Sequence, residues 1–222
     1  MTEQCFIVKK GGTHMKFKHI IWDYDGTLFD SYPIVAAAFH ETLVAYGIDE
    51  DINEIYSLMK VTLAHANAHY KAKYNLDDAF FEQYKNLRTV SDADKTAPFS
   101  GAIELCAAIC EAGGKNYLYT HRNDSAIAAI KKYGMAQHFI EFITSRQQFT
   151  PKPSPDAVLY LMEKYNIPPD EAIMIGDRDI DIMSGKNAGI FSCYFSDEGE
   201  SCDVADYNVR SLSELYGVLG IV

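Results

Sequence analysis

The chain has 222 residues, the length of one large domain or of one domain with an insertion. Hydrophobic residues make up 48% and charged residues 23%, which indicates a sizeable core and excludes both a disordered chain and a membrane span. The net charge of −11 argues against nucleic acid and membrane surfaces as partners, because both are bound by clustered Lys and Arg.

Residues 1–14 are expected to be a flexible leader. The five cysteines show no close pairing of the kind that builds a disulfide framework, and this favours a reducing, cytoplasmic location. Cys106 and Cys110 have a spacing that can bind a metal, but they continue an apolar stripe that begins at Ile103 and has helical spacing. Packing in the core is therefore the favoured interpretation for this cysteine pair.

Short apolar runs alternate with helical patterns along the chain. Runs of four to seven residues are typical of strands that are buried on both faces. Their alternation with amphipathic stripes predicts an α/β fold, a Rossmann-like parallel sheet with helices on both faces. The predicted strands are residues 19–22, 116–119, 172–175 and 189–195.

One interval breaks this alternation. About ninety residues separate the first predicted strand from the second, whereas a crossover needs only about a dozen. The interval carries helical stripes rather than loop composition, so we expect residues 31–95 to form a small α-helical cap. The core would then comprise residues 15–30 and 96–222. The three stripes are Val35, Phe39 and Leu43; Ile55, Leu58, Met59 and Thr62; and Phe80, Phe81, Tyr84 and Leu87.

Polar side chains follow the predicted strands, where parallel α/β sheets bind their ligands. In chain order they are Asp23, Asp25, Gly26 and Thr27 after the first strand, Thr120, His121 and Arg122 after the second, Lys152 before a predicted helix, and Asp177 and Asp181 after the next strand.

The motifs Asp23-x-Asp25-Gly26-Thr27-Leu28, Thr120, Lys152 and Gly176-Asp177-x-x-x-Asp181 occur in this order, and the chain resembles the haloacid dehalogenase superfamily. The helices after the first motif resemble the branch of phosphoglycolate phosphatase and β-phosphoglucomutase. The resemblance runs from about residue 15 to the C-terminus. It implies a Mg²⁺-dependent phosphatase that hydrolyses a small phosphorylated metabolite through an aspartyl-phosphate.

The residues of the first motif suit this chemistry. A carboxylate such as Asp23 can attack phosphorus and divide one difficult step into two. Asp25 can protonate the leaving alkoxide and then take a proton from the hydrolytic water. Gly26 permits a sharp turn that brings backbone N–H groups to the phosphate, and we place Thr27 beside it as a substrate-binding residue.

A phosphate dianion among carboxylates requires positive charge. Mg²⁺ is the expected cofactor, held by Asp23, Asp177 and Asp181, and the resemblance adds the carbonyl of Asp25 as a ligand. Lys152 supplies a fixed positive charge, and Thr120 a hydroxyl donor, to the phosphate oxygens in the transition state. For Asp181, a role in orienting the metal ligands is an alternative to direct coordination.

Other residues have two interpretations each. His121 and Arg122 depart from the family's most common continuation after Thr120, and Arg122 suits either a substrate anion or solvent. The same choice holds for Arg88 in the cap. Solvated or partner-bonded side chains are favoured over a zinc site for His65 and His69.

Several alternatives stay open at this stage. For residues 23–30, a calcium loop and a simple hairpin turn are disfavoured. Asp179 is interpreted as a helix-capping acid. A phosphomutase and a non-catalytic binding protein are the alternatives to a phosphatase, and the sequence carries no signal for an oligomeric state.

Overall fold

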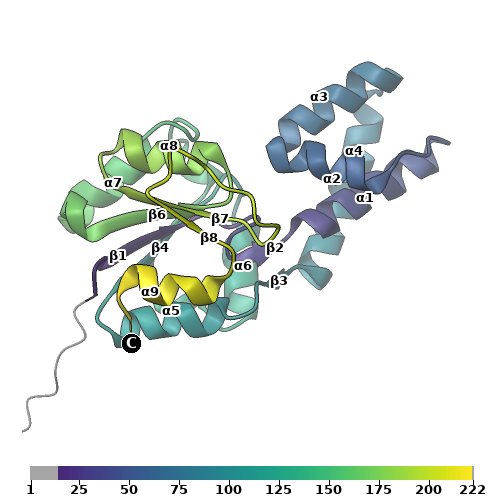
Figure 1. The fold of residues 1–222 in the computed structure, drawn as a ribbon. Coiled ribbons are helices and arrows are strands. Elements are labelled where there is room, and N and C mark those ends of the chain that lie inside the picture. The colour runs from purple at the N-terminus through teal and green to yellow at the C-terminus, as the bar shows by residue number, and fades with distance from the viewer. Residues whose placement is uncertain (1–14, 222) are drawn as a thin grey trace, which may run out of the picture.

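The computed structural model describes residues 15–221, except for the side chains of residues 90–94, and the predicted leader lies outside the described residues. A six-stranded sheet has the order β5-β4-β1-β6-β7-β8, and each neighbouring pair is parallel (Figure 1). The predicted parallel α/β fold is therefore confirmed. The strands are β1 (His19–Trp22), β4 (Lys115–Tyr119), β5 (Phe139–Ile143), β6 (Ala172–Gly176), β7 (Phe191–Phe195) and β8 (Tyr207–Val209).

Two hydrophobic clusters cover the two faces of the sheet, because successive side chains of a strand point in opposite directions. Ile20 and Trp22 join one cluster, and Ile21 joins the other. Figure 1 shows α7 and α8 over one face and α5 and α9 over the other. The core helices are α5 (Ala102–Glu111), α6 (Ser125–Lys132), α7 (Asp156–Tyr165), α8 (Asp179–Asn187) and α9 (Leu215–Leu219), with short 3₁₀ turns η1 (Ala136–His138), η2 (Ser145–Gln147), η3 (Pro169–Glu171) and η4 (Leu212–Glu214).

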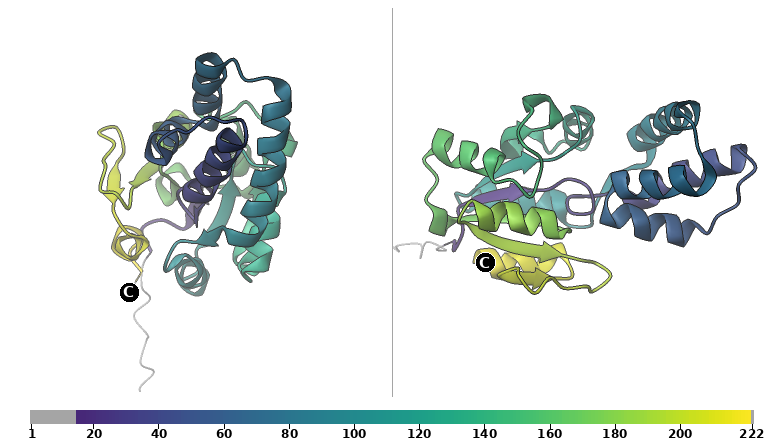
Figure 2. Two further views of the ribbon diagram at one scale, coloured as in Figure 1. Left: turned by 90° about the vertical axis from the view of Figure 1, so that its right-hand side faces the viewer. Right: turned by 90° about the horizontal axis from the view of Figure 1, so that it is seen from above.

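Four of the helices between β1 and β4 project from the sheet as a separate bundle, as the right-hand view in Figure 2 shows. They share a third hydrophobic cluster, in which the Phe39 ring contacts the rings of Tyr70, Phe80 and Tyr84. This separate cluster supports our proposal that residues 31–95 form a cap. The helices are α1 (Tyr32–Ala45), α2 (Ile52–Val61), α3 (Leu63–Tyr74) and α4 (Asp78–Lys95).

The chain passes between core and cap through a short antiparallel ribbon. Its two strands are β2 (Phe29–Asp30) and β3 (Ala97–Pro98). The ribbon places the start and the end of the helical bundle side by side. The cap is thus joined to the core at the edge where β1 ends.

The structure differs from the predicted elements in several places. Thr62, assigned to the second helical stripe, lies between α2 and α3, where its side chain accepts a hydrogen bond from the backbone N–H of His65. Helix α3 and strands β5 and β8 were not predicted. Strand β7 begins at Phe191 rather than at Gly189, because Gly189 has a φ of +79° that a strand does not accommodate.

The order of the strands explains where a site can form. β1 lies between β4 and β6, so the segments that follow these three strands meet at one edge. The chain enters the sheet at β1 and later returns to strands on both sides of it, and such switch points are where open α/β sheets bind ligands.

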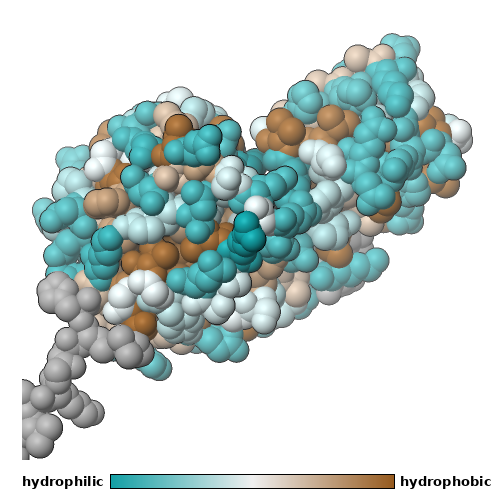
Figure 3. Space-filling model, in the orientation of Figure 1, coloured by the Kyte–Doolittle hydropathy of each residue, from teal (hydrophilic) through white to brown (hydrophobic). Residues whose placement is uncertain are grey.

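The surface agrees with the charge of the sequence. In the orientation of Figure 3, hydrophilic residues cover most of the core and the cap, and the hydrophobic patches between them are scattered. Within residues 15–221, no helix has both the length and the apolar character needed to cross a membrane.

Phe39→Ala should lower the free energy of unfolding of the cap by about 3–5 kcal/mol, because a fully buried ring is deleted. The single tryptophan, Trp22, lies in the core, so its fluorescence follows the core while circular dichroism follows all helices. In urea, the circular dichroism transition should shift further than the fluorescence transition. Phe81→Ala, at a partly exposed cap position, is the matched control with a smaller shift. Equal shifts of both probes would contradict an independently folding cap.

Candidate active site

Three buried carboxylates meet at the edge where β1 and β6 end. Asp23 follows β1, Asp177 follows β6, and Asp181 lies in the first turn of α8. One oxygen from each lies within 4.8 Å of the others. Burial and the charge of Asp181 raise the pKa of Asp23 to about 6, and burial with the charges of Asp181 and Asp23 raises the pKa of Asp177 well above its usual range. The three groups therefore repel one another.

Lys152 supplies part of the compensating charge. Its Nζ lies 2.6 Å from Asp23 Oδ1 and 2.7 Å from Asp181 Oδ1, and its side chain is fully buried. Although burial alone would lower the pKa of Lys152, the Asp181 and Asp23 carboxylates raise it, so the amine stays charged. The ammonium also lies 4.5 Å from the centre of the Tyr119 ring. The geometry holds Lys152 against the proposed nucleophile.

The acidic cluster fits a divalent cation. Its donors are carboxylate oxygens, the ligands that Mg²⁺ prefers. Asp23 Oδ2 is buried and has no hydrogen-bond partner among the described residues, which is costly unless another group contacts it. A bound cation would satisfy this oxygen and relieve the repulsion among the three carboxylates.

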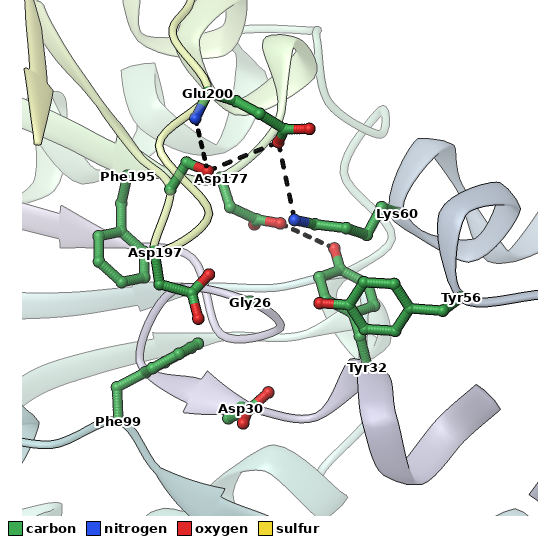
Figure 4. Close-up of a pocket in the computed structure, with 11 residues that line it drawn as sticks. Gly26, Asp30, Tyr32, Tyr56, Lys60, Phe99, Asp177, Phe195, Asp197 and Glu200 are labelled. Carbon is green, nitrogen blue, oxygen red and sulfur yellow. Dashed lines mark hydrogen bonds and ion pairs between the residues drawn. The ribbon is translucent and has the colours of Figure 1, made fainter. Parts of the chain in front are cut away.

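Asp177 is surrounded by hydrogen-bond donors from the first motif and from the start of the cap. Tyr32 Oη donates to Asp177 Oδ2 at 2.9 Å, as Figure 4 shows, and Thr27 Oγ1 donates to Asp177 Oδ1 at 3.2 Å. Gly26 has a φ of +72°, and a Cβ there would lie 2.4 Å from Asp177 Oδ2, so only glycine fits without displacing the carboxylate. Thr27, predicted to bind substrate, thus directs its hydroxyl to the acidic cluster, and the Gly26 N–H donates to Phe29 O.

Asp25 lies in an ion pair with Arg122. Arg122 Nε donates to Asp25 Oδ1 at 2.8 Å and to Oδ2 at 2.9 Å, and its Nη2 lies 2.6 Å from Oδ1. The Ser31 hydroxyl also donates to Oδ1. Burial opposes the charge of Asp25, but Arg122, Ser31 and the positive charge of Arg88 outweigh it and lower the pKa of Asp25 to about 2. In this arrangement the carboxyl group of Asp25 is ionised.

Thr120 and His121 follow β4 and lie beside the cluster. Thr120 Oγ1 accepts a hydrogen bond from the backbone N–H of Arg122 at 3.1 Å, so its own proton is available for donation. His121 Nε2 accepts from the backbone N–H of Lys152 at 3.0 Å. Desolvation, followed by the positive charges of Lys152 and Arg178, lowers the pKa of His121 to about 4 and keeps the ring neutral. His121 thus positions the loop that carries Lys152.

Several contacting residues were not predicted. Ser31 and Tyr32 begin the cap and contact Asp25 and Asp177, but no motif marks them. Arg178 follows Asp177, and its Nη2 lies 3.9 Å from Asp23 Oδ2. The position of Arg178 between two predicted ligands is a signal that could have identified it.

The cap contacts the core beside this cluster, around a pocket shown in Figure 4. Lys60 Nζ lies 2.8 Å from Glu198 Oε2 and 3.7 Å from Glu200 Oε2. Tyr56 Oη donates to Glu198 Oε1 at 3.1 Å. These bonds join α2 to the segment after β7. The pocket also contains the carboxylates of Asp30, Asp177 and Asp197, so this side of the site is acidic.

The remaining candidates do not belong to the acidic cluster. Cys106 is buried in the core of the sheet and helices, as predicted. His65 and His69 belong to no group of potential metal ligands among the described residues. Asp179 is an exposed acid in the first turn of α8, whose N-cap position is occupied by Arg178.

Residues 20–195 match the family model of the haloacid dehalogenase-like hydrolases. A phosphoglycolate phosphatase from Vibrio parahaemolyticus is 28% identical to this chain, and the alignment covers 94% of this chain and 99% of the relative. The span that matches the family model includes every predicted site residue, from Asp23 to Asp181.

Solved structures show the same similarity. A hydrolase from Streptococcus pneumoniae TIGR4 is 35% identical, with a TM-score of 0.69, and the match covers 93% of this chain and all of the other. A haloacid dehalogenase family hydrolase from Deinococcus radiodurans, solved with bound phosphate and sodium, has a TM-score of 0.77 at 18% identity and shares the fold. That match covers 92% of this chain and 95% of the other.

Asp177→Asn should stabilise the metal-free protein at pH 7.5. The folded-state pKa of Asp177 lies above the unfolded value near 3.8. Between these two pKa values the folded state binds more protons than the unfolded state, so the free energy of unfolding falls as the pH rises. Removing the charge should raise the melting temperature in EDTA by at least about 2 °C, the shift that roughly 1 kcal/mol produces in a chain of this size. This gain in melting temperature should shrink as the pH is lowered toward 3.8, because Asp177 of the wild type then becomes protonated.

Asp179→Asn is the matched control, because it removes the same charge from an exposed position two residues away. It should give no gain. Excess MgCl₂ should raise the melting temperature of the wild type and of Asp179→Asn, and raise that of Asp177→Asn much less. If Asp177→Asn melts no higher than Asp179→Asn in EDTA, the acidic cluster is not electrostatically strained.

Proposed function

The chain belongs to the haloacid dehalogenase-like hydrolase family, and we propose that this phosphatase hydrolyses a small phosphorylated metabolite, with Mg²⁺, through an aspartyl-phosphate on Asp23. The observation that carries the proposal is the contact of Asp23 with Lys152 inside the acidic cluster. It combines a nucleophile, a fixed positive charge and a site for a cation within one buried edge of the sheet.

In the first step a carboxylate oxygen of Asp23 attacks phosphorus, and the bond from phosphorus to the leaving oxygen breaks. Asp23 Oδ1 is held by Lys152, whereas Oδ2 has no hydrogen-bond partner among the described residues. Lys152 thereby fixes the rotation of the carboxylate and orients it for attack. The product of this step is an acyl phosphate on Asp23.

Asp25 moves the protons of both steps. Its protonated form gives a proton to the leaving oxygen, and its carboxylate then accepts a proton from the water that attacks the aspartyl-phosphate. This second step releases inorganic phosphate and regenerates Asp23. Asp25 must first loosen from Arg122 to carry a proton, because the ion pair lowers its pKa to about 2.

The residues that would hold Mg²⁺ are Asp23, Asp177 and Asp181, with the backbone of Asp25 as a further ligand. Gly26, the next residue, lies directly beside Asp177, which supports this set. When bound, the cation neutralises charge on the phosphate and on the carboxylates around it.

Lys152 and Thr120 would stabilise the equatorial oxygens of the transferring phosphoryl group. Lys152 brings a positive charge that is already desolvated. Thr120 Oγ1 accepts a hydrogen bond from the Arg122 N–H, so the hydroxyl proton of Thr120 can be donated to the phosphoryl group. Groups that are positioned before the reaction need no reorganisation when charge develops. The cap would exclude water and choose the substrate, and phosphoglycolate is the first compound to test because the matched relative carries that name.

The test is release of phosphate from p-nitrophenyl phosphate. We expect turnover with MgCl₂, loss of turnover with EDTA, and a decrease of more than about 10³-fold in Asp23→Asn, because the covalent nucleophile is removed. Asp179→Asn, which lies outside the cluster, should keep wild-type activity. Activity that survives in both EDTA and Asp23→Asn would refute the mechanism.

A product analysis separates hydrolysis from phosphoryl transfer back to the substrate. With a hexose 1-phosphate, a phosphatase releases inorganic phosphate, whereas a phosphomutase yields an isomerised sugar phosphate. Formation of the isomer without free phosphate would show that the enzyme is a phosphomutase and not a phosphatase. No turnover on any of a broad panel of phosphate esters would favour a binding protein.

A further inference from the structure

Arg122 is a rigidly held cation that lies beside Asp25 rather than beside the acidic cluster. Its guanidinium makes the two-oxygen contact with Asp25 through Nε, and its carbon Cζ lies 5.0 Å from the centre of the Tyr24 ring. Its backbone is held by the bond from Ser145 N–H to Arg122 O at 2.8 Å. The side chain is only 6% exposed. The guanidinium is therefore built into the site and is not a solvated surface charge.

The position of Asp25 defines which part of a substrate lies next to Arg122. A general acid must come within about 2.6–3.2 Å of the leaving oxygen. Arg122 Nη2 lies 2.6 Å from Asp25 Oδ1, so substituents one or two bonds beyond the leaving oxygen come next to the guanidinium. Lys152, in contrast, lies on the side of Asp23 and serves the phosphate.

The charge around the site supports the same assignment. The pocket of Figure 4 is lined by the carboxylates of Asp30, Asp197 and Glu200, and Lys60, which also lines it, is paired with Glu198 and Glu200. Arg122 follows β4, which lies on the other side of β1 in the sheet. On this side, the positive charge of Arg88 in the cap helps to lower the pKa of Asp25. A negative substituent on the leaving group would be repelled on the first side and attracted on the second.

We propose that Arg122 is a specificity-determining residue that binds an anionic group, a carboxylate or a second phosphate, on the leaving group of the substrate. A guanidinium suits this task because its planar fork, which contacts Asp25 in this structure, can donate to two oxygens of a substrate anion once Asp25 takes up a proton and loosens. The inference rests on the proposed phosphatase activity. It predicts that the enzyme distinguishes substrates by the charge of the leaving group.

The test compares leaving groups of similar size and different charge. 2-Phosphoglycolate carries a carboxylate, pyrophosphate carries a second phosphate, and isobutyl phosphate carries a neutral group of nearly the shape of the carboxylate. The wild type should prefer at least one of the two anionic substrates over isobutyl phosphate in kcat/KM, and the preferred one identifies the anion. Arg122→Gln should reduce that preference by roughly tenfold to hundredfold, the effect of losing a hydrogen bond between charged groups.

Ratios between substrates separate specificity from a merely positional role. If Arg122 only positions Asp25, Arg122→Gln lowers kcat/KM equally for the anionic and the neutral substrate, and the proposal is overturned. Arg122→Lys keeps the charge but loses the fork, so it should retain part of the preference. Arg146→Gln is the matched control, since Arg146 is exposed, pairs with Asp124 and should leave the preference unchanged.

The outcomes also distinguish this inference from the proposed function. If p-nitrophenyl phosphate is hydrolysed with MgCl₂ but the wild type shows no preference for either anionic substrate, the phosphatase stands and the role of Arg122 is wrong. If no phosphate ester is hydrolysed at all, the proposed function fails and this inference fails with it.

Discussion

Repulsion among three buried carboxylates is the constraint on which the rest of the site depends. Asp23, Asp177 and Asp181 are too close to remain charged together without compensation, since burial removes the water that would screen them. The chain compensates with Lys152 between two of them and with Arg178 nearby. If the cluster holds a cation and a phosphate group, as we propose, its repulsion lowers the stability of the empty protein, as expected where function and folding compete.

The order of the strands makes this arrangement possible. β1 carries Asp23 to the middle of the sheet, and its neighbours β4 and β6 bring Thr120 and Asp177 to the same edge. The helix α8 starts there as well, so its first turn adds Asp181, and the backbone N–H of Arg178 donates to Asp181 Oδ2 at 3.1 Å. The cap leaves the core at this edge, and its first residues, Ser31 and Tyr32, become part of the site.

The sequence was informative where a feature is local and uninformative where it depends on distant packing. The ends of β1, β4 and β6 could be predicted because each apolar run is followed at once by a polar residue with recognisable spacing. Strand β5 was missed because this edge strand carries Glu141 and is only partly buried, and β8 has only three residues. The bond between Tyr32 and Asp177 joins residues 145 positions apart, so no sequence pattern reveals it.

The two sides of β1 also differ in charge, and this difference bears on how an acidic protein accepts an anion. The net charge of −11 is concentrated in part around the segment after β7, where Glu198 and Glu200 bind Lys60 of the cap. The charge of Lys60 is neutralised by these two glutamates. The contact therefore joins the cap to the core but does not attract a phosphate ester. The opposite side, after β4, keeps Arg122 against Asp25. In the roles that we propose for Lys152 and Arg122, the electrostatic field of the protein orients an anionic substrate before the reaction, with its phosphate toward Lys152 and its second charge toward Arg122.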